Sequence, residues 1–264
     1  MNTDKGAFSM NYIVLDLEFN QPFQFKTGFQ TTLHPKCPFE IIQIGAVKLN
    51  DQLCILDKFN ILIKPVIYPR IHPYVEKITN LTYEQLKSGV CFSEAYASFI
   101  KFIGKKDAIL CTWGNDDVKS LFKNILFYNL DATKICNQFI NVQKFASIYL
   151  KYQPGQAIGL KNAVTELNLK IESTFHDALN DAIYTAKIFQ IVYSKENSPE
   201  ICQISELFHN HETTHLHMKG LVEYFEKILN RKLTVEEKML IKKSYKLGKN
   251  CSFDIPKKEN KYYK

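Results

Sequence analysis

The amino-acid sequence predicts an α/β protein in which helices flank a mixed β-sheet, followed by a small helical appendage. Three strand-like segments lie close together near the start of the chain with no helix between them, which indicates an antiparallel meander. Helix-like and strand-like segments then alternate, and this order is typical of an α/β sandwich. A polar, proline-containing stretch separates this part from two further helical segments.

The first three segments are expected to be strands at Tyr12–Asn20, Glu40–Leu49 and Leu53–Lys64. In the first of them Ile13, Val14 and Leu15 run together, as in a strand that is buried on both faces. A tight turn at Asn50 and Asp51 joins the other two strands.

The middle of the chain is expected to add two strands, Asp107–Thr112 and Phe139–Val142. The expected helices are Ser93–Ile103, Asp117–Tyr128, Gln143–Tyr152, Leu160–Leu167 and Asp177–Ser194. Apolar residues recur at helical spacing in these segments, as in Ala95, Phe99 and Phe102. The prediction is therefore a sheet of five strands.

The composition indicates a main domain and a basic appendage. The linker candidate is residues 195–200, so the main domain is expected at 10–195 and the appendage at 200–252. The chain carries a net charge of +7, but Lys227–Lys264 holds twelve Lys or Arg against four Asp or Glu. That stretch carries +8 and everything before it about −1. A basic end of this kind can meet a polyanion, although a solvated lysine-rich surface is the alternative.

The appendage is expected to be a pair of antiparallel helices, Lys219–Asn230 and Val235–Leu247. Thr234 and Glu237 have the spacing of a capping box at the start of the second helix. Within that helix one apolar face is expected to dock inward, formed by Val235, Met239, Leu240 and Leu247. The lysines expected to stay outside, within reach of phosphates, are Lys238, Lys242, Lys243, Lys246 and Lys249.

Composition also bears on the compartment. Hydrophobic residues make up 45% of the chain and charged residues 23%, the balance of an ordinary globular protein. No apolar run is long enough to span a bilayer, and Met1–Asn11 lacks the apolar segment of a signal peptide. The seven cysteines are odd in number and form no CxxC motif, which favours reduced thiols. A cytoplasmic protein with no membrane partner is the expectation.

Two carboxylates interrupt the first strand, at Asp16 and Glu18. Side chains at positions i and i+2 point to the same side of a strand, so both acids project together from a core element. Burying two like charges is costly unless a cation neutralises them or one takes up a proton, and a divalent metal is the simplest remedy. A strand end whose acids reach solvent is the alternative.

Further candidate residues occur after a later strand and at the start of the last long helix. Asp116 and Asp117 follow a Trp-Gly turn. An acid there lies at the carboxyl edge of the sheet, although helix N-caps also use Asp. Asp117 is preferred because Val118, Leu121 and Phe122, in the helix that it opens, have the spacing for packing inward. Asp181 lies beside an alanine-rich stripe that allows its helix to approach the sheet, and His176 precedes that helix; a structural histidine is the alternative reading.

Taken together, the motifs are DxE on the first strand, Asp after a Trp-Gly turn, and H-x4-D at a late helix. This combination resembles the DEDDh exonucleases of the RNase H-like superfamily, and most of all the branch that includes KapD-like and Eri1-type 3′–5′ exonucleases. Supporting matches are Ile41–Val47 and Leu160–Asn162, and the resemblance covers Tyr12–Val192. Family members usually have a glycine-containing turn where this chain has Ile78–Thr82, and Asn80 can adopt the left-handed conformation there.

The resemblance implies an RNase H-like three-layer α/β/α fold and a metal-dependent 3′–5′ exonuclease. The residues implied to hold two Mg²⁺ or Mn²⁺ ions are Asp16, Glu18, Asp117 and Asp181, and His176 is implied to be the general base. The implied substrate is single-stranded RNA or DNA with a free 3′ end, released as 5′-mononucleotides. The alternative function is a regulatory protein that keeps the fold for binding and does not need catalysis.

Two other groups of side chains carry weaker hypotheses. Phe23, Phe25 and Phe29 occupy a long loop beside the acidic strand and are able either to stack on bases or to pack the loop. The histidines at 209, 211, 215 and 217 are close enough together for zinc or nickel, but no Cys or acid completes a familiar ligand spacing.

Overall fold

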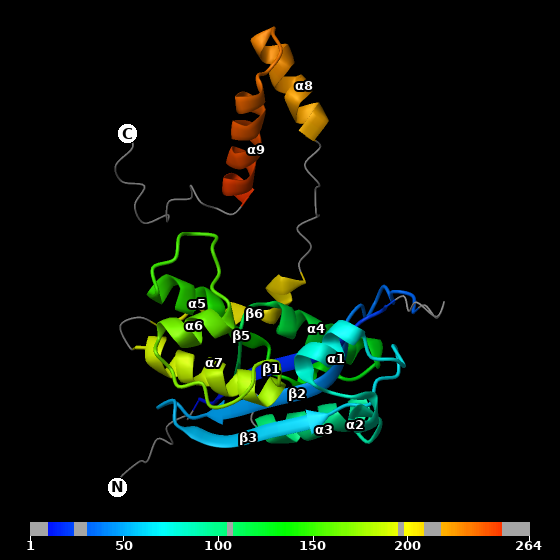
Figure 1. The fold of residues 1–264 in the computed structure, drawn as a ribbon. Coiled ribbons are helices and arrows are strands. Elements are labelled where there is room, and N and C mark those ends of the chain that lie inside the picture. The colour runs from blue at the N-terminus through cyan, green and yellow to red at the C-terminus, as the bar shows by residue number, and fades with distance from the viewer. Residues whose placement is uncertain (1–9, 24–30, 105–107, 195–197, 209–217, 250–264) are drawn as a thin grey trace. The chain divides into compact units, whose positions relative to one another are not determined.

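The computed structural model describes residues 10–23, 31–104, 108–194, 198–208 and 218–249 of the chain (Figure 1). Backbone proximity divides the chain into two compact units. The larger unit contains every element from β1 to the 3₁₀ turn η2, and the smaller unit contains α8 and α9. The predicted residues Phe25, Phe29 and the histidines between 209 and 217 lie outside the described ranges.

The larger unit is built on a mixed sheet of six strands. Their order across the sheet is β3 (Ile55–Leu62), β2 (Glu40–Leu49), β1 (Tyr12–Asn20), β4 (Ile109–Thr112), β5 (Gln138–Asn141) and β6 (Cys202–Gln203). The first three strands form the predicted antiparallel meander. The next two run parallel to β1, as the alternation of strands and helices implies.

The predicted count of five strands was wrong by one. β6 pairs antiparallel with β5, where Gln203 faces Gln138, and the backbone N–H of Ile204 donates to Asn137 O at 2.8 Å. A strand of two residues has no periodic pattern, so only its pairing partner reveals it. The sheet-containing unit consequently extends past residues 195–200, where a linker was expected.

Alternating residues of β1 enter two different cores, which creates the three-layer α/β/α arrangement (Figure 1). Ile13, Leu15 and Leu17 belong to the core that includes α3 (Phe92–Ile103) and α4 (Asp116–Phe127). Tyr12 and Val14 belong to the opposite core. The helices of that second core are α5 (Val142–Tyr149), α6 (Leu160–Glu166) and α7 (Ala178–Val192). The fold class predicted from the sequence is confirmed.

Two short helices, α1 (Pro73–Thr79) and α2 (Tyr83–Lys87), were not predicted. His72 caps α1, and Asn80 ends it in the left-handed conformation (φ 57°, ψ 16°), so the prediction for this residue is confirmed. A capping box between Thr82 and Gln85 then starts α2. Helices of seven and five residues are too short to show a helical pattern.

Buried polar side chains hold the segment before α1 against the sheet. The Glu40 carboxylate accepts hydrogen bonds from the backbone N–H groups of Val66, Ile67 and Tyr68. Asn20, at the end of β1, accepts from the backbone N–H of His72 at 2.9 Å. The start of α1 is thereby tied to the strand that carries Asp16 and Glu18. The 3₁₀ turns of this unit are Ala132–Lys134 (η1) and Ile204–Leu207 (η2).

The smaller unit is the predicted helical pair, α8 (Met218–Leu229) and α9 (Val235–Lys249). The capping box at its turn is confirmed: Thr234 N–H donates to Glu237 at 2.8 Å, and Glu237 N–H donates to Thr234 Oγ1 at 3.2 Å. Leu233 is buried in the turn between the helices. The helical pair therefore has a defined, hydrogen-bonded connection.

The predicted inward face of α9 was wrong for two residues. Val235 is 69% exposed and Met239 60% exposed, whereas Leu240, although 63% exposed, lines the groove between the helices as predicted. Ile241 and Tyr245 instead face a groove shared with Leu221 of α8. The inward stripe therefore begins at Leu240 rather than at Val235. The side chains of Lys246, Leu247 and Lys249 are outside the described set.

Within the described part of the chain, no helix is both long and apolar enough to cross a membrane. The described cysteines, Cys37, Cys54, Cys91, Cys111, Cys136 and Cys202, are all free thiols.

Candidate active site

Asp16 and Glu18 project from β1 toward the layer that contains α7. They have the same parity along the strand as Tyr12 and Val14, whose side chains lie in the core shared with α7. Glu18 is 8% exposed, and Asp16 is half-buried. On the neighbouring strand β2 the residue opposite Asp16 is Gly45. The paired acids of the sequence motif therefore share one face of the central strand.

Asp117 reaches the same region from the first turn of α4. β4 runs parallel to β1, with Thr112 beside Leu15, so the end of β4 lies next to Asp16. Gly114 has φ +104°, a conformation that glycine adopts readily, and it turns the chain from β4 into α4. Asp117 is 9% exposed, whereas Asp116 is exposed to solvent. The structure thus places Asp117, rather than Asp116, toward the interior.

His176 and Asp181 come from the start of α7. The backbone N–H of His176 donates to Asp181 Oδ2 at 3.0 Å, and His176 itself has φ +64°. The His176 side chain is exposed, while Asp181 is 7% exposed. Ligand atoms of Glu18, His176 and Asp181 all lie within 4.8 Å of one another. Residues 158 positions apart in the sequence therefore meet at one point.

Burial opposes the ionisation of all four acids. Burial, together with the charges of Asp117, Asp181 and Glu18, raises the pKa of Asp16 well above its usual range. Burial and the Asp181 and Asp117 carboxylates raise the pKa of Glu18 to about 8. Burial and the charges of Asp116 and Asp181 raise the pKa of Asp117 to about 8. For these three carboxylates burial is the main cause of the shift, and the charges of neighbouring acids add to it.

Asp181 is the least perturbed of the four. Burial raises its pKa to about 6, while the hydrogen bond from the His176 backbone and the nearby imidazole act in the opposite direction. Its second oxygen, Oδ1, is buried and has no hydrogen-bond partner among the described residues. A buried acceptor of this kind is costly unless something binds it.

These features fit divalent cations. Mg²⁺ and Mn²⁺ prefer oxygen ligands, and a cation removes both the mutual repulsion of the acids and the unsatisfied state of Asp181 Oδ1. The site also has an exposed imidazole beside the acids that is able to exchange a proton with a bound water. The arrangement is therefore suited to metal-assisted hydrolysis.

Two polar residues near the site had no role in the sequence-based prediction, Gln43 on β2 and Asp177 before α7. Asp177 caps α7 by accepting from Asn180 N–H at 3.0 Å, and its other oxygen accepts from Gln43 Nε2 at 2.9 Å. A signal was present in the sequence, because Gln43 is the one polar residue within the run Ile41–Val47. A polar side chain in a strand buried on both faces needs a specific partner.

Comparisons with known proteins agree with this geometry. The family model described as "Exonuclease" (RNase_T) matches residues 13–189. This chain belongs to that exonuclease family. This chain is 26% identical over 183 residues to the probable 3′-5′ exonuclease KapD of Bacillus subtilis. The aligned region covers 68% of this chain and 83% of KapD.

Solved structures share the fold of the exonuclease. The nuclease domain of 3′hExo, a DEDDh family member bound to rAMP, superposes with a TM-score of 0.62 at 20% identity. That match covers 75% of this chain and 98% of the other. E. coli Exonuclease I in complex with a dA16 oligonucleotide has a TM-score of 0.54 at 13% identity, with coverage of 69% and 40%. The resemblance to DEDDh 3′–5′ exonucleases noted in the sequence is confirmed.

Proposed function

We propose that this exonuclease is a metal-dependent enzyme that hydrolyses single-stranded RNA or DNA from the 3′ end and releases 5′-mononucleotides. The observation that carries the proposal is the cluster of Glu18, His176 and Asp181, whose ligand atoms lie within 4.8 Å of one another. Asp16 shares the face of β1 with Glu18, and the buried Asp117 follows the strand that pairs with β1. Hydrolysis of a phosphodiester needs charge stabilisation and a positioned proton acceptor, and this set of residues is able to supply both.

The four acids divide the task of holding two Mg²⁺ or Mn²⁺ ions: Asp16, Glu18, Asp117 and Asp181. When bound, the ions would supply an activated water and stabilise the charge that develops on the phosphate oxygens. The chain holds Asp16 and Glu18 rigidly in the central strand, and it holds Asp181 through the hydrogen bond from His176 N–H. Ligands held in this way would keep the bound ions in a fixed position relative to the substrate phosphate.

His176 would act as the general base. Its imidazole is exposed, so a ring nitrogen is able to take the proton of the attacking water and pass it to solvent. The left-handed backbone at this residue (φ +64°) turns the side chain out of the helix start while its N–H stays on Asp181. The imidazole is not assigned as a metal ligand.

The named relatives support a nucleic-acid substrate without choosing between RNA and DNA. Exonuclease I was solved with a deoxyadenosine oligonucleotide, and a 3′-exonuclease of this fold is described in 3′-end recognition of a histone mRNA stem-loop. Discrimination of the 2′-hydroxyl depends on contacts made by the bound nucleotide. A cytoplasmic location and the domain division near residue 200 stay predictions.

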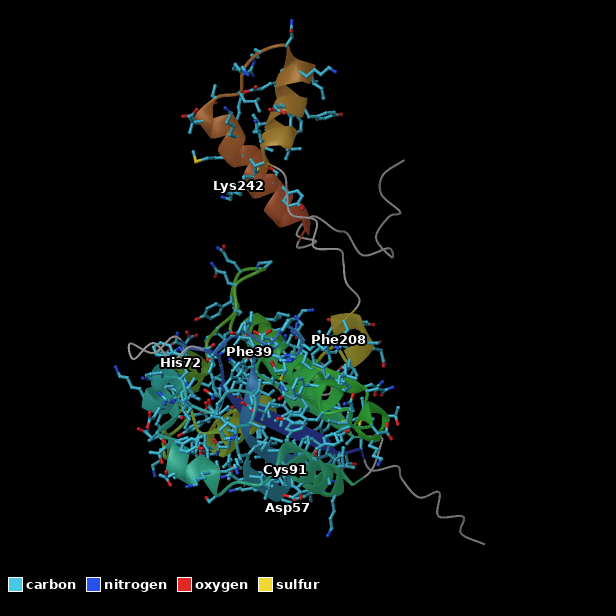
Figure 2. The ribbon with its side chains drawn as sticks, turned by 90° about the vertical axis from the view of Figure 1, so that its right-hand side faces the viewer. Phe39, Asp57, His72, Cys91, Phe208 and Lys242 are labelled. Carbon is cyan, nitrogen blue, oxygen red and sulfur yellow. The ribbon has the colours of Figure 1, made fainter. Side chains whose placement is uncertain are left out.

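The basic α8–α9 pair is proposed to add phosphate contacts outside the site. The range Met218–Lys249 holds nine Lys or Arg against four Glu. Three of these cations form ion pairs near the turn, namely Arg231, Lys232 and Lys238 with Glu237 or Glu226. Lys242 and Lys243 are exposed on α9, where Figure 2 labels Lys242. Lysines on such a surface bind phosphates without regard to sequence.

The test is hydrolysis of 3′-labelled RNA and DNA oligonucleotides in parallel, with Mg²⁺, Mn²⁺ or excess chelator. We expect 5′-mononucleotides that appear from the labelled end, no activity in chelator, and no activity in Asp16→Ala. Glu166→Gln, an exposed acid on α6, serves as the matched control and should keep full activity. Full activity in chelator would falsify the metal-dependent reading. A folded but inactive wild type would favour the regulatory alternative.

A further inference from the structure

Gln43 of β2 is fully enclosed, at 1% exposure, and its side-chain amide makes three hydrogen bonds. Nε2 donates to Asp177 Oδ2 at 2.9 Å and to Asn60 Oδ1 at 3.0 Å. Oε1 accepts from the backbone N–H of Ala178 at 3.2 Å. One side chain thus holds both the capping residue and the first residue of α7.

The start of α7 lies directly on β2 at this point. A Cβ added to Gly45, two residues along the strand from Gln43, would lie 2.1 Å from the backbone carbon of Ala178. Asp177 continues the connection, because its carbonyl accepts from Asp181 N–H at 2.9 Å. The residues on either side of this attachment are His176 and Asp181. Their placement relative to β1 therefore depends on where β2 holds the helix.

The chemistry of the contact requires an amide at position 43. Its nitrogen faces two oxygen acceptors, and its oxygen faces a backbone N–H. A carboxylate there would keep the bond from Ala178 but would direct an oxygen at Asp177 Oδ2 without a proton between them. A methionine at position 43, with a thioether side chain of similar length, would remove all three hydrogen bonds. It would leave the polar groups of Asp177, Asn60 and the Ala178 backbone without this partner.

We propose that Gln43 is a positioning residue for the exonuclease site, one that sets the His176 imidazole and the Asp181 carboxylate against Asp16 and Glu18 through the start of α7. The inference rests on the proposed function for its readout of activity. Gln43 lies beneath α7 and does not reach the substrate, so its effect falls on turnover and on metal binding. Residues that orient metal ligands typically contribute about 10- to 100-fold to affinity or activity.

The first experiment exchanges the hydrogen-bond donor and acceptor between positions 43 and 177. Gln43→Met and Gln43→Glu should each lower kcat by about 10- to 100-fold with little change in KM. The double variant Gln43→Glu with Asp177→Asn reverses donor and acceptor, because the amide introduced at position 177 is able to donate to the carboxylate introduced at position 43 while its oxygen still caps α7. This double variant should recover most of the kcat lost in Gln43→Glu. Asn60→Ala is the matched control, since it removes only the bond that does not involve α7, and it should stay near wild-type turnover.

The second experiment separates positioning from general stability. In a His176→Ala background, Gln43→Met should reduce the rate by a smaller factor than in the wild type, because part of its effect passes through the imidazole. The rise in Tm on adding Mn²⁺ should also be smaller in Gln43→Met than in the wild type, since the start of α7, which carries Asp181, is no longer fixed to β2. Near-native kcat in the single variants, or no recovery in a folded double variant, would overturn the proposal. Gln43→Met lowering the rate by the same factor in the wild type and in His176→Ala would also overturn the proposal.

The outcomes also distinguish this proposal from the proposed function. If the wild type is inactive on every nucleic acid tested, the function fails, but the Mn²⁺-dependent rise in Tm still measures whether Gln43 holds Asp181. If the wild type is active and the Gln43 variants match it, only the positioning role fails.

Discussion

The backbone N–H of His176 donates a 3.0 Å hydrogen bond to Oδ2 of Asp181, so the proposed general base and a proposed metal ligand are held by one contact. The imidazole remains exposed while the carboxylate is buried. Because the bond comes from the backbone, replacing the His176 side chain leaves it in place. The two roles can therefore be tested separately.

His176→Ala should lose most of the hydrolytic rate and keep metal binding. The backbone bond to Asp181 persists, so titration with Mn²⁺ followed by calorimetry should give an affinity close to that of the wild type. Loss of a general base typically lowers the rate by about 10²- to 10⁴-fold. A general base must be neutral to accept a proton, so the pH profile of the rate should differ between the wild type and the variant. Near-native turnover of His176→Ala would contradict the proposed role of His176 as the general base of a DEDDh site.

Without metal, the stability of the exonuclease should fall as the pH rises from about 4 to about 8. Glu18 and Asp117 have pKa values raised to about 8 by burial and by neighbouring acids, and Asp181 a pKa raised to about 6. The folded state therefore binds more protons than the unfolded state in this range, and the stabilisation present below pH 4 is lost as these groups ionise.

Thermal unfolding in chelator and in Mg²⁺ across this pH range measures the effect. Metal should flatten the dependence, because a bound cation stabilises the ionised acids. Glu18→Gln in chelator should reduce the slope, whereas Glu166→Gln, exposed on α6, should leave it unchanged. A Tm that rises with pH in chelator would contradict the clustering of the four acids.

Gly45→Ala should destabilise the protein and lower turnover. The new Cβ would lie 2.1 Å from two backbone atoms of the α7 start, the carbon of Ala178 and the nitrogen of Leu179, so the helix must move away from β2. Overpacking of this kind typically costs about 1–3 kcal/mol. Denaturant unfolding and kcat should both report the change. In Gly159→Ala the added Cβ has no atom within 4 Å, so this control should lose only the modest N-cap preference, about 1 kcal/mol.

The proposed phosphate contacts of α9 predict a change in salt dependence. In the full chain, Lys242→Gln with Lys243→Gln should weaken binding of long oligonucleotides and make the plot of log K against log salt shallower, by about 0.7 for each lost contact to a single strand. Lys58→Gln with Lys101→Gln, exposed on β3 and α3, is the matched control. Equal slopes for the wild type and the α9 variant would mean that these lysines are only a solvated surface.

A shortened chain gives a second measurement of the same hypothesis. The sequence suggested an end near Lys195, but β6 and η2 belong to the sheet-containing unit, so the shortened chain should end at Phe208. It should cleave dinucleotides about as well as the full chain, because they are too short to reach a second surface.

The sequence predicted the strand and helix that carry the site because their patterns are long. The apolar run of Tyr12–Asn20 and the alanine stripe of α7 each extend over several residues, and both occur where expected. Asn80 was predicted correctly from one residue, since few side chains tolerate a left-handed turn.

The parts of the fold and of the site that the sequence did not predict depend on contacts that the pattern of a single segment does not show. β6 is defined only by its pairing with β5, and α1 and α2 by caps at His72 and Thr82. The inward face of α9 is defined by the groove that its residues share with α8, a contact that the pattern of α9 alone does not specify. Gln43 and Asp177 lie 134 positions apart, and neither residue indicates its partner by itself.

The two-residue strand β6 also determines how the sheet ends. Unpaired strand edges are able to recruit other chains, and proteins protect them with charge or with a covering segment. At one edge β3 carries exposed charges at Asp57 and Lys58, and Figure 2 labels Asp57. At the other edge β6 occupies the hydrogen-bonding groups of β5 at Gln138 and Phe139. A chain that ended before Cys202 would leave this edge of β5 without its partner strand, and an exposed edge of this kind promotes self-association of the sheet.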